Sequence, residues 1–247
     1  MRKYIFAITI VLFLITAGIV YLTSTSNSFT SSTNSTNSTN SSSFINSTIG
    51  SDSKGYVTKT VYASPGPHKV KIAVITGIHP REKLAIDPVI NLIKNYPLTH
   101  DVEIINYAIN VQDHPDDYTI GRNNGEKLAA EYIVPDINNT KPDLVIICHA
   151  HQLNYGSGFF ITTPAMDNNS VTLAENVRKT IPEFRYYDAS DDARANATSN
   201  IRVSEPIAIA GYPVFVYEVP EWVSVGNATN VTYQLIDTSF NIINSNK

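Results

Sequence analysis

Three groups of residues in the sequence could take part in metal-dependent or acid–base chemistry. His79 and Glu82 stand three positions apart in the segment "HPRE". His149 and His151 follow the apolar run "DLVIIC", and Glu218 ends the apolar run "VFVY". Two histidines and one carboxylate are a known ligand set for catalytic zinc, and a further carboxylate can take a proton from the attacking water. These residue types therefore indicate a metal-dependent hydrolase.

Each of these residues also has an ordinary structural interpretation. A His-x-x-Glu pair recurs by chance and can form a polar turn between a strand and a helix. His149 can be a core histidine with satisfied hydrogen bonds, and Glu218 can pair locally. The order of the groups favours the metal site, because each one directly follows an apolar strand, and ligands of open α/β sheets bind beyond the carboxyl ends of strands.

Alternating strands and helices are expected around these residues. Helical spacing predicts a helix over 82–96 that starts late or bends because of Pro88. A loop over 113–126 would carry Arg122 and Asn123. This pattern predicts an α/β fold with a mixed, mostly parallel sheet flanked by helices. The other predicted helices cover 124–134, 170–181 and 230–245, and the predicted strands cover 56–63, 69–77, 101–110, 143–150, 158–163 and 212–219.

The N-terminal part of the chain has a different composition. Residues 4–22 carry no charge after Arg2 and Lys3, and a helix of that length spans about 28 Å, close to a hydrocarbon core of ~30 Å. We expect residues 1–22 to form a single transmembrane anchor in the cell membrane, with the rest outside the cytoplasm. A cleaved signal peptide, which would give a secreted protein, is the alternative.

Residues 23–54 are mostly Ser, Thr and Asn, which predicts a disordered tether before a catalytic domain over 55–247. Repeated Asn-x-Ser/Thr triplets in the tether predict a glycoprotein. The net charge of −4 argues against nucleic acid as a partner. Cys148 is the only cysteine, so no intrachain disulfide can form, and it is expected to be a small core residue.

The segments "GIHPRE", "DLVIICHAH" and "VFVYEV" resemble the motifs of the zinc metallocarboxypeptidases, a superfamily that includes the succinylglutamate desuccinylases and aspartoacylases. The resemblance implies a zinc-carboxypeptidase-like fold in which His79, Glu82 and His149 bind one zinc ion and Glu218 is the general base. His149 is preferred to His151 because it comes first after the strand. His151 would then line the substrate pocket, and it is the second choice as a ligand.

The resemblance also has departures. The family usually has an Asn-Arg pair that binds the terminal carboxylate of the substrate, whereas here Arg122 precedes Asn123 in "GRNNGE". We expect both residues to contact substrate, although the reversed order leaves other arginines open. Those alternatives are Arg194 and Arg202, and the candidates for the tyrosine that closes over substrate in larger family members are Tyr186, Tyr187 and Tyr212.

The resulting expectation is a membrane-anchored, extracytoplasmic zinc metallopeptidase of the carboxypeptidase type, acting on peptides such as cell-wall peptides. A zinc-dependent deacylase or amidase of N-acyl amino acids or cell-wall peptides is the alternative, because the domain is short, as in the desuccinylase and aspartoacylase group. A non-catalytic surface binding module is a third possibility. It predicts the loss of a catalytic position, and none of the four is missing.

Overall fold

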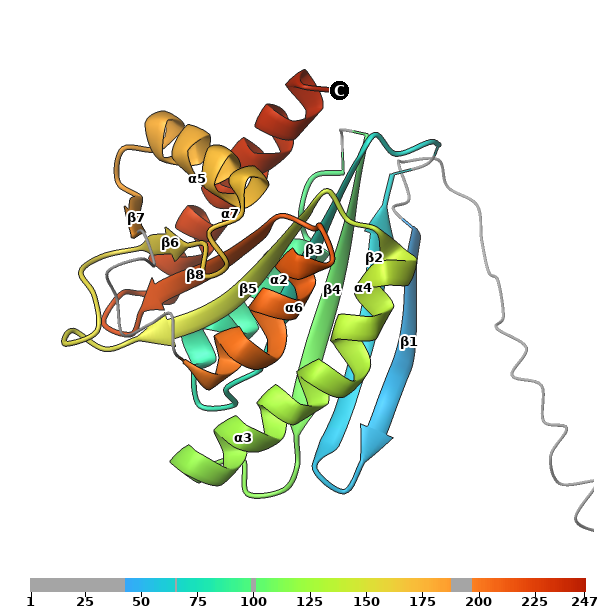
Figure 1. The fold of residues 1–247 in the computed structure, drawn as a ribbon, viewed down its shortest axis with the longest axis vertical. Helices are drawn as coiled ribbons and strands as arrows, with labels where there is room; N and C mark the ends of the chain where they lie inside the picture. The colour runs from blue at the N-terminus through green and yellow to red at the C-terminus, as the bar shows by residue number, and fades with distance from the viewer. Residues whose placement is uncertain (1–42, 65, 99–100, 188–196) are drawn as a thin grey trace, which may run out of the picture. The chain divides into compact units, whose positions relative to one another are not determined.

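An eight-stranded mixed sheet with the order β1-β2-β4-β3-β5-β8-β6-β7 forms the middle layer of the protein (Figure 1). The structure is a computed structural model that describes residues 43–64, 66–98, 101–187 and 197–247. Neighbouring strands in the centre of the sheet are parallel. The central strands are β3 (Val70–Thr76), β4 (Val102–Val111), β5 (Leu144–His151) and β8 (Val214–Pro220).

Short or antiparallel strands complete the two edges of the sheet. At one edge an antiparallel hairpin pairs with β4, and at the other edge a short strand runs antiparallel to β8. The hairpin consists of β1 (Ser43–Asp52) and β2 (Gly55–Ala63), and the opposite edge consists of β6 (Phe160–Thr162) and β7 (Arg185–Tyr187). The predicted mixed sheet flanked by helices is confirmed.

Successive side chains of each central strand point to opposite faces of the sheet. Both faces carry apolar side chains, and helices cover both. Ile72 and Val74 belong to one hydrophobic core, and Ala73 and Ile75 belong to the other. The first core contains residues of α2 (Asp87–Lys94), α5 (Asn168–Thr180) and α7 (Val225–Ser245). The second contains residues of α3 (Tyr118–Leu128), the π-helical turn η2 (Ala129–Ile133), α4 (Val134–Thr140), the π-helical turn η5 (Asn200–Ser204) and α6 (Glu205–Ile209).

A proline and a capping residue mark the starts of two helices, as the sequence predicts. Pro88 lies in the first turn of α2, where its missing N–H needs no partner, so the α-helix starts late after a 3₁₀ turn, η1 (Lys83–Ala85). Asp167 caps α5 by accepting a hydrogen bond from the backbone N–H of Ser170. Cys148 lies in β5 and is buried, as expected.

Two expectations about local structure are wrong. Residues 43–52 belong to the tether predicted over 23–54, but they form β1, whose backbone pairs along β2. Most of the predicted loop over 113–126 is instead the start of α3. Asp117 begins this helix by accepting hydrogen bonds from the backbone N–H groups of Thr119 and Ile120.

The predicted membrane anchor over 1–22 and the tether up to residue 42 lie outside the described residues. Within the described ranges, no helix combines the length and the apolar character that crossing a membrane requires.

Candidate metal centre

The turn that follows β3 brings two of the predicted metal ligands together. Gly77 adopts a φ of +84°, and a Cβ atom there would lie 2.4 Å from the carbonyl oxygen of Ile109. Only glycine fits this close approach without strain. The chain then turns, the backbone N–H of Glu82 donates to the carbonyl of His79 at 3.1 Å, and the 3₁₀ turn η1 begins.

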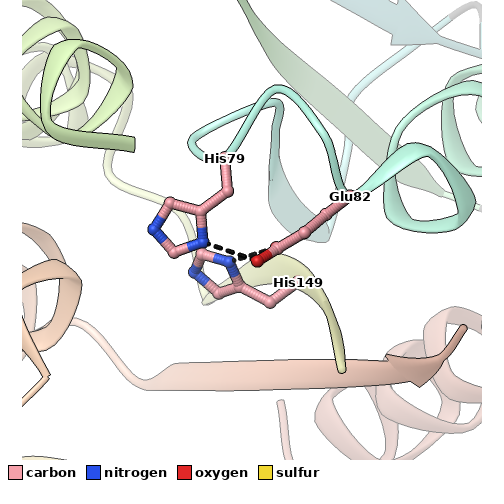
Figure 2. Close-up of side chains that lie close together, drawn as sticks. All are labelled: His79, Glu82 and His149. Atoms are coloured by element: carbon pink, nitrogen blue, oxygen red, sulfur yellow. Dashed lines mark hydrogen bonds and ion pairs between the residues drawn. The ribbon is translucent and has the colours of Figure 1, made fainter. Parts of the chain in front are cut away.

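His79, Glu82 and His149 converge on one point (Figure 2). Their ligand atoms all lie within 4.8 Å of one another. Nδ1 of His79 lies 2.8 Å from Oε1 of Glu82, and Nδ1 of His149 lies 2.8 Å from Oε2 of the same carboxylate. The histidine ring centroids are 4.3 Å apart. The two rings therefore present the same nitrogen, Nδ1, to the carboxylate between them.

This cluster fits a metal ion by its donor chemistry and by its size. Two ligand atoms in a tetrahedral zinc site lie about 3.4 Å apart, so small side-chain movements from 2.8 Å suffice to admit an ion. Burial on its own would raise the pKa of Glu82, but the charges of His149 and His79 and their hydrogen bonds outweigh it and hold the pKa well below its usual range. Glu82 is therefore ionised at neutral pH, as a ligand must be.

Glu218 lies beside this cluster on the neighbouring strand. It is the register partner of His149 in the parallel pairing of β5 and β8, where adjacent strands lie about 4.8 Å apart. Both side chains line the same cavity, which has a volume of about 920 Å³ and opens over the carboxyl ends of the central strands. The cavity therefore combines a metal-type cluster with one further carboxylate.

No protein-family model matches the sequence, and no curated protein matches it. Solved structures do match. A predicted carboxypeptidase from Burkholderia mallei superposes with a TM-score of 0.58 at 12% identity, over 82% of this chain and 64% of that chain. A metallo-carboxypeptidase from Pseudomonas aeruginosa, in complex with (2-guanidinoethylmercapto)succinic acid, gives a TM-score of 0.53 at 10% identity, over 81% and 64%.

The tripeptide-bound cell shape determinant Csd4 from Helicobacter pylori gives a TM-score of 0.51 at 10% identity, over 83% of this chain and 56% of that chain. The protein has the metallocarboxypeptidase fold. At these identities the likeness shows the fold alone, and the chain spans less than two thirds of the length of each of these three proteins.

Two of the three residues predicted to bind substrate line the cavity, and the third does not. Arg122 and His151 line it, whereas Asn123 is not among its lining residues. Oδ1 of Asn123 instead accepts a hydrogen bond from Arg202 at 2.9 Å. Arg202, an alternative for substrate binding, thus faces α3 rather than the cavity.

Arg122 is held against the cluster. Its NH1 group donates to Oε1 of Glu82 at 3.0 Å, and its guanidinium carbon lies 5.1 Å from the ring centroid of Tyr118. The arginine therefore adds positive charge directly beside the carboxylate of the cluster and is fixed there by the tyrosine ring.

His151 does not join the cluster. Its Nδ1 lies 3.1 Å from the carbonyl oxygen of Gln152, and its Nε2 lies 3.0 Å from that of Gly158. Both ring nitrogens thus face backbone acceptors, which leaves neither available as a ligand in this conformation. Of the remaining candidates, Arg194 lies outside the described residues, and the three tyrosines proposed to close over substrate are not among the cavity-lining residues.

Glu126 is a site residue that sequence reasoning missed. Its side chain is only 2% exposed, and Oε1 lies 3.4 Å from Nε2 of His79. Thr198 donates to Oε1 at 2.8 Å, and Arg202 donates to Oε2 at 2.9 Å. With an ion held at Nδ1 of His79, the ring proton would be on Nε2, and Glu126 is placed to accept it and to hold the ring orientation. The i, i+4 spacing of Arg122 and Glu126 could have revealed it once this segment was recognised as helical.

Proposed function

We propose that this protein is a zinc-dependent metallopeptidase of the carboxypeptidase type, which hydrolyses a peptide amide bond with Glu218 as general base. The observation that carries the proposal is the convergence of His79, Glu82 and His149 beside Glu218 at the carboxyl ends of adjacent parallel strands. Two histidines and one carboxylate leave an open coordination position, as a catalytic zinc site requires. The metallocarboxypeptidase fold supports the same reaction class.

His79, Glu82 and His149 would hold the ion, which when bound would supply Lewis-acid activation of water and of the scissile carbonyl. Glu218 accepts a proton from the attacking water and returns it to the leaving amine. Arg122 adds positive charge where the carbonyl oxygen becomes negative. Glu126 keeps Nδ1 of His79 directed at the cluster.

We also propose that the predicted helix within residues 1–22 anchors the protein in the cell membrane and that the domain acts outside the cytoplasm. This location makes external peptides, including cell-wall peptides, available as substrates. The tripeptide bound by Csd4 supports a peptide substrate, since the two chains share a fold.

Metal analysis together with peptide hydrolysis tests this function. The purified protein should contain about one equivalent of zinc and should hydrolyse members of a peptide panel. Glu218→Gln should bind zinc normally and lose at least about 100-fold in kcat, within the range typical of a general base. Retained hydrolysis in Glu218→Gln would eliminate the role of Glu218, and a folded protein that binds no metal would eliminate the site.

One observation favours a second candidate, a zinc-dependent deacylase or amidase. Arg122 is already paired with Glu82, and Asn123 is bonded to Arg202, so this pair does not form a free clamp for a terminal carboxylate. Comparing peptides that have a free C-terminus with the same peptides carrying a C-terminal amide separates the two candidates. A carboxypeptidase requires the free C-terminal carboxylate. A deacylase cleaves N-acyl amino acids and should tolerate the C-terminal amide.

A further inference from the structure

Charged side chains of both signs line the cavity. The turn after β3 contributes Arg81, Glu82 and Lys83, α3 and its N-cap contribute Arg122 and Asp117, and the end of β8 contributes Glu218 and Glu221. Arg122 is paired with Glu82. Glu221 is exposed, and its carboxylate has no hydrogen-bond or ion-pair partner in the described ranges. The cavity thus contains a carboxylate that is free to meet a positive charge from outside.

An exposed tryptophan follows Glu221 in the chain. Trp222 lies in the turn after β8 and is 45% exposed. The backbone N–H of Glu221 donates to the carbonyl of His151 at 2.9 Å, which ties this turn to the end of β5. The indole packs edge-on against the His151 ring, with ring centroids 5.2 Å apart. Trp222 is therefore held at the edge of the cavity rather than free in solvent.

The histidine that supports Trp222 is itself fixed. Two backbone carbonyls face its ring nitrogens, and its ring centroid lies 4.9 Å from that of Phe160 and 6.2 Å from that of Tyr155. Tyr155 lines the cavity and is 38% exposed. Two partly exposed aromatic rings therefore flank a fixed histidine beside an unpaired carboxylate.

We propose that Glu221, Trp222 and Tyr155 form a subsite that binds a positively charged group of the substrate, an ammonium or a guanidinium. An aromatic ring attracts a cation through its quadrupole, and a neighbouring carboxylate adds ionic attraction. Glu221 and Trp222 come three and four residues after Glu218, and Tyr155, Glu218 and Glu221 line the same cavity, so a bound cation would belong to a residue near the scissile bond. The inference rests on the proposed peptidase function and specifies its substrate class as peptides with a basic side chain or a free amino terminus.

Trp222 is the only tryptophan in the chain, so its fluorescence reports on this subsite directly. The experiment uses Glu218→Gln protein loaded with zinc, and a set of alanine hexapeptides in which one lysine occupies each position in turn. Matching peptides carry norleucine, which has a similar stem without the charge. Each peptide is prepared with a free and with an acetylated N-terminus, which separates a side-chain ammonium from a terminal one.

We expect at least one lysine peptide to change the Trp222 emission and to bind about two- to fivefold more tightly than its norleucine counterpart. If the terminal amino group is the ligand, acetylation of the N-terminus should instead weaken peptide binding. Glu221→Gln, placed in the Glu218→Gln background, should remove the preference for the charged peptide. Glu175→Gln makes the same change of charge on the exposed surface of α5, away from the cavity, and should keep it.

Equal affinity for charged and uncharged peptides would overturn the subsite, as would a preference that survives Glu221→Gln. Peptide binding measured by calorimetry without any change in Trp222 emission would also overturn it. In each of these results, cleavage of the same peptides by wild-type protein leaves the proposed peptidase function intact. If no peptide binds or is cleaved, both proposals fail.

Discussion

Glu126 should control zinc affinity although it is not a ligand. The structure gives it one contact with the cluster, the 3.4 Å approach of Oε1 to Nε2 of His79. Removing a carboxylate that orients a metal-binding histidine typically costs 10–100-fold in metal affinity. Because 3.4 Å is long for a charge-assisted hydrogen bond, we expect Glu126→Gln to lie at the lower end, about tenfold, or about 1.4 kcal/mol.

Competition with a chromophoric zinc chelator at fixed pH measures this affinity. Arg202→Gln is the matched control, since it removes a hydrogen bond to Glu126 and leaves the carboxylate beside His79. Its effect on zinc affinity should be smaller than that of Glu126→Gln. Melting of the metal-free proteins shows whether either variant has changed the fold.

The reasoning fails if Glu126→Gln folds normally and its zinc affinity stays within about twofold of wild type. That result would mean that packing alone orients His79. A larger loss in Arg202→Gln than in Glu126→Gln would also contradict it, because the arginine reaches the cluster only through the carboxylate.

Three further predictions concern stability. Burial on its own would raise the pKa of Asp136, but hydrogen bonding from Lys59 outweighs burial and lowers this pKa. The stabilisation that the Asp136 carboxylate gives is therefore present above about pH 4 and is lost as pH falls through the folded-state pKa. Asp136→Asn should therefore cost about 1–3 kcal/mol at neutral pH in urea unfolding, and the difference from wild type should shrink below pH ~4. Gly125→Ala should cost about 3 kcal/mol because its Cβ would lie 1.9 Å from the carbonyl oxygen of Ile78, whereas Gly226→Ala, with no atom within 4 Å, should cost nothing in the same assay. Removing zinc with a chelator should lower the melting temperature by about 5–11 °C if the ion is present at 100 times its dissociation constant, and an unchanged melting curve would contradict a tightly bound ion.

The centre of the sheet could be predicted because its local signal agrees with its final environment. β5 and β8 are buried along their whole length, and their sequences are nearly continuous apolar runs. The chemistry-bearing residues stand at the ends of these strands, so the strand-end rule placed His149 and Glu218 at one edge of one sheet. The pairing of His149 with Glu218 in the sheet follows from the same parallel order.

β1 could not be predicted from its own sequence. It is polar, its first residues are exposed, and it lies at the edge of the sheet, so no hydrophobic pattern marks it. Its order comes from a backbone ladder with β2 and from contact with a helix: a Cβ atom at Gly50 would lie 2.1 Å from the ring of Tyr132. Both are tertiary effects that a local pattern does not record.

The turn "HPRE" is fixed in position by α3. Part of this helix was expected to be a loop, and its charged residues contact the turn. Arg122 and Glu126 stand one turn apart on α3, and they contact Glu82 and His79, respectively. Gly125 lets the helix approach the backbone that precedes His79.

Glu82 contacts His79, His149 and Arg122, and Glu126 contacts His79 and Arg202. Glu82 and Arg122 carry opposite formal charges, as do Glu126 and Arg202, so neither pair adds net charge beside the cluster. The segment "GRNNGE" therefore holds His79 and Glu82 in place and balances the charge of Glu82.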